Sequence, residues 1–395
     1  MRIVVVGAGV IGLLTAMECV RAGARVDLVD RAGIPSPSAT SNDLHRVVRT
    51  LHRGDAALTM AAARAHEGWL DVERRLGARF YHQAGVLTAM GAQDVETNYT
   101  MVTAAGLPAQ ALTAADLSAR YPQIRFGPGR AAVFEPAAGA VLAGQALRRL
   151  ARWMRDQPAV RLHPHRRVVA VDGAGAVLLA DGTTLTGDRV VVAAGPWSRD
   201  LLPAVLAGDL TLHRQTMLSY APATSRQAWA GTPAVLGLGE SGDAWLMPPV
   251  AGTPVRLSAA SACRAVPEMT GRVPPGEWRD HLIDRFAMLL TDFDPAAVIG
   301  AADGYYLTDT ARGGPLLADL GDGSEGVEGV EGVEGVEGVE GVVWAYAACG
   351  GMSFKFAPLI ARALADRAVG RPPRSTGLDS IDRPRQLAAR YRQPA

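Results

Sequence analysis

The chain has 395 residues, 48% of them hydrophobic and 20% charged, and a formal net charge of +1. That length is ample for two domains, and the composition is typical of a globular protein. A charge this close to zero gives no electrostatic reason to expect a nucleic acid or an anionic membrane as partner. A small-molecule ligand is therefore the better expectation.

The spacing of cysteine and histidine indicates neither a disulfide framework nor a metal site. Cys19, Cys263 and Cys349 are far apart and form no CxxC pair, which fits a reduced, cytoplasmic location. His163 and His165 flank a proline, and a surface loop explains them better than metal ligation, because no further ligand cluster accompanies them. We expect no bound metal.

The N-terminal segment predicts a strand, a glycine turn, a helix and a second strand. Residues 2–6 (RIVVV) form an apolar run, a helical pattern continues to about residue 22, and ARVDLVD follows. This order is that of a right-handed βαβ unit. The apolar start also resembles a signal peptide, but three glycines interrupt it. The chain contains no run of eighteen apolar residues, so its sequence predicts no membrane span.

The glycines of this unit form the pattern GxGxxG. In such a turn the first glycine permits the bend, the second lets the backbone approach a pyrophosphate, and the third allows close helix packing. Asp30 ends the second strand, where an acid accepts a hydrogen bond from an unphosphorylated ribose, as in FAD or NAD. The expected cofactor contacts are Gly7, Gly9, Val10, Ile11, Gly12, Asp30 and Arg31.

FAD is favoured over NAD by the segment VVVAAGPWS at residues 190–198. It predicts a buried strand that ends in a glycine turn, which could be one more core strand. In flavoproteins of the glutathione-reductase type, such a strand closes over the nucleotide. The expected contacts here are Val168, Ala194, Gly195 and Trp197.

The rest of the chain predicts both helices and strands. Helices are expected at residues 56–77, 140–156 and 276–292, and in APLIARALADRAVG. Strands are expected in RVVRTLH, in AGVLTAMG, within residues 160–197, along the alternating segment 206–262, and in VVWAYAA. Parallel-type runs thus lie at the start, near residue 190 and near residue 343, with antiparallel patterning between them.

This alternation predicts an α/β fold with an α+β second domain. A discontinuous, Rossmann-like FAD-binding domain of glutathione-reductase type would comprise residues 1–80, 140–205 and 300–375. An inserted, mainly antiparallel substrate domain would comprise residues 81–139 and 206–299, and a C-terminal tail residues 376–395. The EGV repeat at 321–341 is better explained as a low-complexity loop than as a functional acidic element.

Several segments together resemble the D-amino-acid-oxidase-type flavoproteins, in the branch of monomeric sarcosine oxidase and N-methyltryptophan oxidase. They are VVGAGVIGLLTA, SNDLHRVVRTLH, VVVAAGPWSRDLL, GYYLTDT and CGGMSFKFAP. The resemblance implies FAD at a domain interface and oxidation of the C–N bond of a small amine or amino acid. Hydride passes to flavin N5, an imine forms, and O2 is reduced to hydrogen peroxide.

The same resemblance assigns roles to three cations. Arg46 would lie near the flavin, whereas Arg49 and Lys355 would bind the substrate carboxylate. A guanidinium suits a carboxylate because its planar fork donates two parallel hydrogen bonds. Lys355 stands between Phe354 and Phe356, and a desolvated ammonium needs an anion. The alternatives are surface arginines and a lysine that extends into solvent.

The glycines before the last helix are expected to approach the flavin. Backbone N–H groups there would stabilise negative charge on the reduced ring, in the manner of an oxyanion hole. The expected contacts are Gly350, Gly351, Met352, Ser353, Phe354 and Lys355.

Three departures from the branch pattern affect the prediction. Tyr305 stands where covalent members attach flavin to cysteine, so we expect non-covalent FAD, with Cys349 as the alternative attachment point. Arg256 stands at the position of the lysine that activates oxygen, which puts fast oxidase activity in question. Met352 and Ala260 replace two histidines and make the pocket less polar.

Aromatic residues are expected to line the substrate pocket. Trp245 matches a substrate-lining position, and Tyr305, Tyr306 and Trp344 are candidates for the same wall, although each could be core. They would favour a ring-containing or bulky amino acid. No general base stands out, and His45 is the one nearby titratable group.

Three functions remain open. The first is an FAD-dependent amine or amino-acid oxidase, monomeric by default. The second is a biosynthetic tailoring dehydrogenase or oxidase with slow O2 reactivity, and the third a non-catalytic FAD-binding subunit. Arg49 and Lys355 together argue against the third, because a mere FAD binder needs no carboxylate site.

Overall fold

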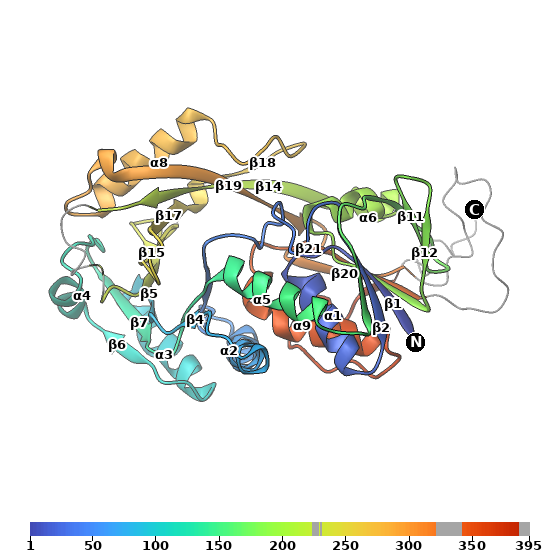
Figure 1. The fold of residues 1–395 in the computed structure, drawn as a ribbon. Helices are drawn as coiled ribbons and strands as arrows, with labels where there is room; N and C mark the ends of the chain where they lie inside the picture. Colours follow the sequence, from blue (N-terminus) through green and yellow to red (C-terminus); the bar gives the residue numbers. More distant parts are fainter. Residues whose placement is uncertain (223–228, 230, 321–341, 387–395) are drawn as a thin grey trace, which may run out of the picture.

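The computed structural model describes residues 1–222, 229, 231–320 and 342–386. The predicted EGV loop and the last part of the predicted tail lie outside these residues. Two large sheets dominate the described chain (Figure 1). The prediction of a mixed α/β fold is confirmed.

The first sheet has seven strands in the order β22-β20-β21-β13-β1-β2-β9. Their bounds are β1 Arg2–Val6, β2 Arg25–Val29, β9 Val160–His163, β13 Arg189–Val192, β20 Pro315–Asp319, β21 Val342–Cys349 and β22 Arg385–Gln386. The five strands from β21 to β9 are parallel, and β20 runs antiparallel to β21. The three apolar runs predicted to be parallel strands therefore meet at the centre of one sheet.

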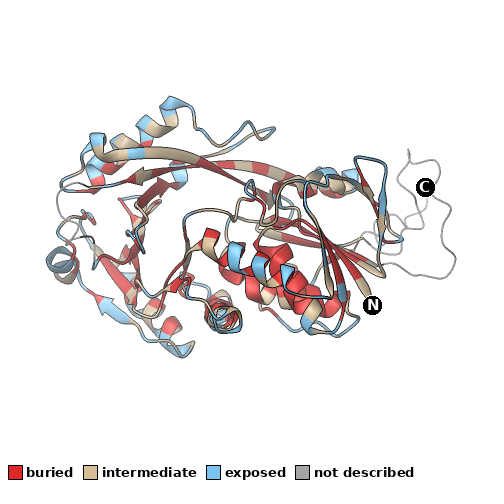
Figure 2. Ribbon diagram, viewed as in Figure 1, coloured by how far each residue is buried: buried red, intermediate tan, exposed pale blue. Residues whose placement is uncertain are grey.

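Both faces of this sheet are covered, which explains why β1 is apolar at successive positions. Ile3 and Val5 pack into a core formed with helices, whereas Val4 and Val6 pack on the other face. The helices of the first face are α1 Val10–Arg21, α2 Ala56–Leu76, α5 Ala143–Arg155 and α9 Ser353–Ala368. A three-stranded sheet covers the second face, formed by β10 Val168–Val171, β11 Ala176–Leu179 and β12 Thr184–Thr186. In Figure 2, α1 and α9 are buried over most of their length.

The second sheet has nine strands and is mostly antiparallel. Its strands are β5 Val86–Gly91, β6 Gln110–Leu112, β7 Arg130–Glu135, β14 Leu210–Tyr220, β15 Ala234–Leu238, β16 Ala244–Met247, β17 Val255–Ala259, β18 Cys263–Ala265 and β19 Val298–Asp309. β14 and β19 pair along their whole length, and Figure 1 shows this long ribbon connecting the two halves of the molecule. Helix α8, Gly276–Leu289, packs on β14 and β17.

The smaller elements complete the chain. β3 Arg46–Val48, β4 Tyr81–His82 and β8 Gly139–Val141 form a second three-stranded sheet. The remaining helices are α3 Val95–Ala104, α4 Ala114–Arg120, α6 Ala204–Ala207 and α10 Asp379–Asp382, with 3-10 turns η1 Ala92–Asp94, η2 Gly195–Leu201, η3 Ala260–Ala262 and η4 Pro295–Ala297. No helix of the described chain is long and apolar enough to cross a membrane. Nor do its His, Cys, Asp and Glu side chains form a group of three that could hold a metal ion.

Several predicted boundaries differ from the structure. The strand expected in RVVRTLH ends at Val48, and the helix expected from residue 140 begins at Ala143, because β8 occupies 139–141. β19 begins at Val298, in the predicted substrate domain, and continues to Asp309 in the predicted FAD-binding segment 300–375, yet all of it pairs with the second sheet. The predicted tail contributes β22 to the first sheet, and β15 runs parallel to β5 within a segment expected to be antiparallel.

Candidate active site

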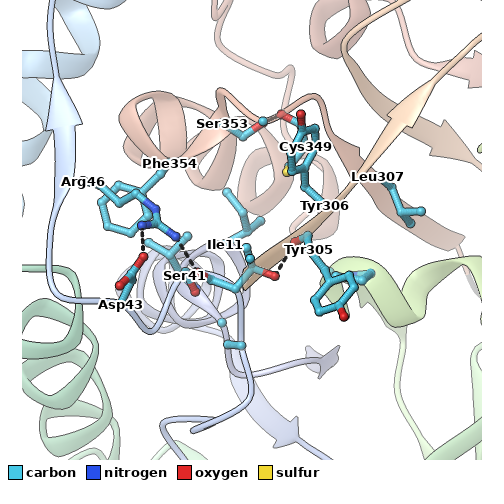
Figure 3. Close-up of a pocket in the computed structure, with 18 of the residues that line it drawn as sticks. Ile11, Ser41, Asp43, Arg46, Tyr305, Tyr306, Leu307, Cys349, Ser353 and Phe354 are labelled. Atoms are coloured by element: carbon cyan, nitrogen blue, oxygen red, sulfur yellow. Dashed lines mark hydrogen bonds and ion pairs between the residues drawn. The ribbon is translucent and has the colours of Figure 1, made fainter. Parts of the chain in front are cut away.

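A cavity of about 830 Å³ lies where the two sheets approach each other. The glycine turn after β1 and the start of α9 line it from the first sheet, and residues of β14, β16 and β17 line it from the second. Figure 3 shows part of this lining, with side chains from the segment before β3, from β19 and from the start of α9 converging. Residues far apart in sequence therefore meet in one space.

The GxGxxG turn has the geometry that the sequence predicts. Gly7 has φ +105°, and a Cβ there would collide with the carbonyl of Ala193. A Cβ on Gly12 would collide with the carbonyl of Gly7, so only glycine lets α1 begin this close to the turn. Gly7 and Gly9 line the cavity, whereas Gly12 serves this packing and does not line it. The N-terminal backbone of α1 therefore faces the cavity directly.

Asp30 lies at the end of β2 and also lines the cavity. Its Oδ2 accepts a hydrogen bond from the Ala8 N–H at 2.7 Å, and its Oδ1 accepts one from the Ala32 N–H at 2.8 Å. Each carboxylate oxygen can accept a second hydrogen bond, so the carboxylate can still bind a hydroxyl. Beyond it, the Arg31 guanidinium lies 5.0 Å from the centre of the Trp197 ring, in cation–π contact.

These features fit FAD. The N-termini of α1 and α9 both border the cavity, and each favours negative charge. Gly351 has φ +70° and lines the cavity, and the other predicted residues that line it are Val10, Ile11, Val168, Ala194, Gly195, Met352, Ser353 and Phe354. Gly350 does not line it: a Cβ there would press on the backbone of Gly314, 2.8 Å away. The packing against Gly314 therefore explains why position 350 is a glycine.

One carboxylate joins two cations beside the cavity. The Asp43 carboxylate pairs with Arg46 through Oδ2, and its Oδ1 lies 3.7 Å from Nη2 of Arg256 (Figure 3 shows the Arg46 pair). Burial alone would raise the pKa of Asp43, but the two arginines outweigh it and hold the pKa well below its usual range. Arg256 also donates to Ser219 Oγ at 2.9 Å. The positive charge of Arg256 is therefore partly neutralised within the protein.

A second pair of cations has no such carboxylate. Arg49 and Lys355 both line the cavity, and among the described residues no carboxylate oxygen lies within 4 Å of either charged group. Lys355 is only 8% exposed, and burial and nearby Arg49 lower its pKa well below the usual value. Burial likewise lowers the pKa of Arg49. Two cations at one wall, Lys355 buried and Arg49 half-buried, make a site without a paired anion.

The backbone of Lys355 is held by helix α2. The Trp69 indole N–H donates to the Lys355 carbonyl at 3.0 Å, and the Trp69 ring stacks on Phe354 at 5.1 Å. Gly68 lets the two helices approach, because a Cβ there would lie 2.8 Å from Pro358. The lysine flanked by phenylalanines is therefore rigidly placed, and its side chain turns into the cavity.

His45 lines the cavity and is 4% exposed. Its Nε2 has no hydrogen-bond partner among the described residues. Burial lowers its pKa to about 4, although Asp43 opposes this, so the ring is neutral near pH 7. A neutral, unpartnered ring nitrogen can accept a hydrogen bond from a ligand N–H.

The far wall of the cavity is aromatic and sulfur-rich. Trp245, Tyr305 and Tyr306 line it as expected, together with Met217 and Met247. The Tyr305 hydroxyl donates to the Gly271 carbonyl at 2.6 Å. Of the two alternatives for Trp344, the core position holds: it packs against the first core and does not line the cavity, and the Arg367 guanidinium lies 5.4 Å from its ring centre. Ala260, expected to make the pocket less polar, does not line it and is exposed in turn η3.

Three residues near the cations were not found from the sequence. Asp43 precedes Arg46 by three residues and could have been noticed as its ion-pair partner. His52 follows Arg49, and its Nε2 lies 3.2 Å from Lys355 Nζ. Glu135 is distant in sequence from Arg49 and Lys355, and the pairing of β7 with β5 brings it near them. No local sequence pattern therefore indicated it.

A glycine turn, a strand-end acid and a second helix N-terminus around one cavity are the features of a dinucleotide-binding fold. The family model "FAD dependent oxidoreductase" matches residues 2–367, so the chain belongs to that family, whose cofactor is FAD.

Individual relatives agree with this assignment. The chain is 24% identical over 202 residues to peroxisomal sarcosine oxidase of Mus musculus. The match covers 50% of this chain and 51% of that protein. It is 22% identical over 219 residues to N-methyl-L-tryptophan oxidase of Yersinia pestis, covering 51% and 56%. The chain thus spans about half the length of the curated relatives it matches. The predicted branch is confirmed.

The fold is shared with NikD, described as an unusual amino acid oxidase essential for nikkomycin biosynthesis. The open form of NikD superposes with a TM-score of 0.76 at 20% identity, and the match covers 97% of each chain.

Proposed function

We propose that this protein oxidises the C–N bond of an amine that carries a carboxylate, to give an imine. The observation that supports this most directly is the pair of buried Lys355 and half-buried Arg49, two cations that line the cavity without a carboxylate within 4 Å among the described residues. A bound anion would complete the charge balance of such a pair. The sarcosine and N-methyl-L-tryptophan named for the relatives are both carboxylate-bearing amines.

FAD supplies a hydride acceptor when it is bound. Arg49 and Lys355 would bind the substrate carboxylate and so fix the position of the amine and its neighbouring carbon. Trp245, Met217 and Met247 would exclude water and select a bulky or cyclic substrate. His45 Nε2 would accept a hydrogen bond from the amine N–H. No group in this account has to remove a proton from carbon.

We further propose that FAD is held without a covalent bond. The residue at the expected attachment position is Tyr305, whose hydroxyl is already engaged by the Gly271 carbonyl and by the Thr270 N–H at 3.2 Å. Cys349 lines the cavity and is half-buried, and desolvation raises the pKa of its thiol, which disfavours the reactive thiolate. Release of yellow flavin into the supernatant after acid precipitation of the protein would support this proposal; retention in the pellet would contradict it.

The electron acceptor separates two candidate activities. An oxidase passes electrons to O2 and releases hydrogen peroxide, whereas a dehydrogenase or a biosynthetic tailoring enzyme reacts with O2 slowly. The contact of Arg256 with Asp43 favours slow reaction, because a neutralised cation attracts an anionic oxygen species weakly. O2 remains the acceptor we propose, with the slow enzyme as second candidate.

The experiment is an anaerobic absorbance titration of the purified yellow protein with N-methyl, cyclic and D-amino acids, followed by admission of air. Bleaching by one class of amino acid supports the proposal and names the substrate class. The rate at which colour returns then distinguishes an oxidase from a slow dehydrogenase. Bound FAD that no member of the panel bleaches would favour a non-catalytic FAD-binding subunit.

A further inference from the structure

Glu135 is a buried carboxylate to which neither the family assignment nor the proposed reaction gives a role. It ends strand β7 and is 2% exposed. Its Oε1 accepts two hydrogen bonds, from the Thr50 N–H at 2.7 Å and from the Leu51 N–H at 3.1 Å. Its Oε2 has no hydrogen-bond partner among the described residues. Burying a carboxylate in this way is costly, and the protein keeps it.

The two N–H groups that Glu135 binds belong to the loop that carries the site. Arg49 comes directly before them, and His52 directly after. The next N–H, that of His52, donates to Thr59 Oγ1 on helix α2 at 3.1 Å. Three successive backbone groups are therefore fixed by side chains from two other elements. The direction in which Arg49 enters the cavity depends on these contacts, because no hydrogen bond to another described side chain holds its guanidinium.

Glu135 also adjusts the charge of the site. The charged and titratable groups that interact with Glu135 are Arg49 directly after β3, Lys355 on α9 and Tyr81 on β4, and His52 in the loop lies beside Lys355. Burial and the two cations lower the pKa of His52 to about 2, so this ring is neutral. Glu135 is the one group in this set that raises the pKa of both cations.

A neutral acceptor would do only part of this. A glutamine at the same place could accept the two loop N–H groups through its amide oxygen, but it would not help to keep Lys355 protonated. The geometric and the electrostatic contribution can therefore be separated by substitution.

We propose that Glu135 is the positioning residue of the carboxylate-binding site: it holds the loop that presents Arg49, and it adds a negative charge to the surroundings of Arg49 and Lys355. This inference rests on the proposed function, because it assumes that Arg49 and Lys355 bind the substrate carboxylate.

The test measures binding rather than turnover. Benzoate has a carboxylate but no C–N bond, so the proposed reaction cannot oxidise it. It is titrated into the FAD-loaded protein at pH values from 6 to 9, and its binding is followed by the change in flavin absorbance. Benzyl alcohol, which lacks the carboxylate, is the control ligand. The proteins compared are the wild type, Glu135→Gln, Glu135→Ala and Lys355→Met, each checked for FAD content and melting temperature.

We expect Glu135→Ala to bind benzoate about tenfold more weakly at pH 6, as fits the loss of two loop hydrogen bonds, and to lose further affinity as the pH rises because it also lacks the charge. Glu135→Gln is expected to bind benzoate like the wild type at pH 6. As the pH is raised, both proteins should lose affinity for benzoate, and the variant should do so at a lower pH than the wild type. The sign follows from Lys355: its carboxylate-binding form is the protonated one, and loss of the Glu135 charge lowers its pKa further.

Two outcomes would overturn the inference while leaving the proposed function intact. One is a Glu135→Gln protein whose affinity follows the wild-type pH profile throughout; the other is a Glu135→Ala protein that binds benzoate as tightly as the wild type. If Glu135→Ala does not fold, the pH profile of Glu135→Gln alone decides. Failure of the wild type to bind benzoate, or binding that Lys355→Met leaves unchanged, would instead count against the proposed function itself.

Discussion

The Nζ of Lys355 lies 3.2 Å from the Nε2 of His52. In its ammonium form Lys355 has no acceptor, so it donates in this contact, and Nε2 is then the unprotonated nitrogen of a neutral ring. The only hydrogen-bond partner that the described residues give this buried cation is therefore uncharged. The site is left with positive charge to offer a ligand.

Replacement of Lys355 by methionine removes one of the two cations while keeping much of the side-chain volume. We expect the KM for a carboxylate-bearing amine to rise by an amount equivalent to roughly 2–5 kcal/mol, as for removal of one partner of a buried charge pair. Steady-state kinetics with the best substrate of the panel measure this. An amine without a carboxylate should be affected much less, and equal effects on both would argue against the assignment.

Replacement of His52 by aspartate would give Lys355 an internal counter-ion. The new carboxylate should compete with the substrate carboxylate, so we expect weaker binding of benzoate and a raised KM, with the melting temperature maintained or increased. His52→Asn is the matched control, because an amide oxygen accepts the same hydrogen bond without a charge. If the Asp and Asn variants bind benzoate equally, the charge balance described above is wrong.

Replacement of Asp43 by asparagine leaves Arg46 and Arg256 without their shared carboxylate. Urea unfolding near pH 7 should show a loss of roughly 1–3 kcal/mol, the usual cost of buried groups left without a partner. The pKa of Asp43 is lowered in the folded protein, so its stabilisation is present above the unfolded-state pKa of about 3.9 and is lost as the pH falls below it. The difference between wild type and variant should accordingly shrink in acid. A difference that is constant down to pH 2 would contradict the ion-pair explanation.

Replacement of Gly12 by alanine tests the cofactor turn. The added Cβ would collide with the Gly7 carbonyl, so α1 must move away from the turn and the protein should be purified with little or no bound flavin. Gly276→Ala is the control, since nothing lies within 4 Å of a Cβ at that position. Absorbance at flavin wavelengths per mole of protein measures the difference. A fully yellow Gly12→Ala protein would show that this turn does not form the cofactor site.

Much of the fold follows from local sequence patterns. The βαβ unit, the glycine turn and the apolar strands near 190 and 343 each have a short-range signature, and the structure brings them into one sheet. Arg49 and Lys355 were also predictable as members of one site, but through resemblance to a family rather than from their spacing.

What could not be predicted depends on contacts between distant segments. Glu135 reaches the Arg49 loop because β7 pairs with β5, and nothing near it in sequence indicates a partner 85 residues away. Trp344 looked like a pocket aromatic, but alternation along β21 places it against Arg367 instead. Gly350 belongs to a cofactor-like motif, yet its neighbour Gly314 explains it.

The most direct measurement compares matched ligands that differ only by a carboxylate. N-methyl-L-tryptophan with N-methyltryptamine, and L-proline with pyrrolidine, are titrated anaerobically into the FAD-loaded protein while flavin absorbance is followed. The account predicts that an acid bleaches the flavin at concentrations where its decarboxylated partner does not, and that Lys355→Met reduces this preference. Equal bleaching by both members of a pair, or bleaching by the simple amine alone, would contradict the proposal that Arg49 and Lys355 select a carboxylate-bearing amine.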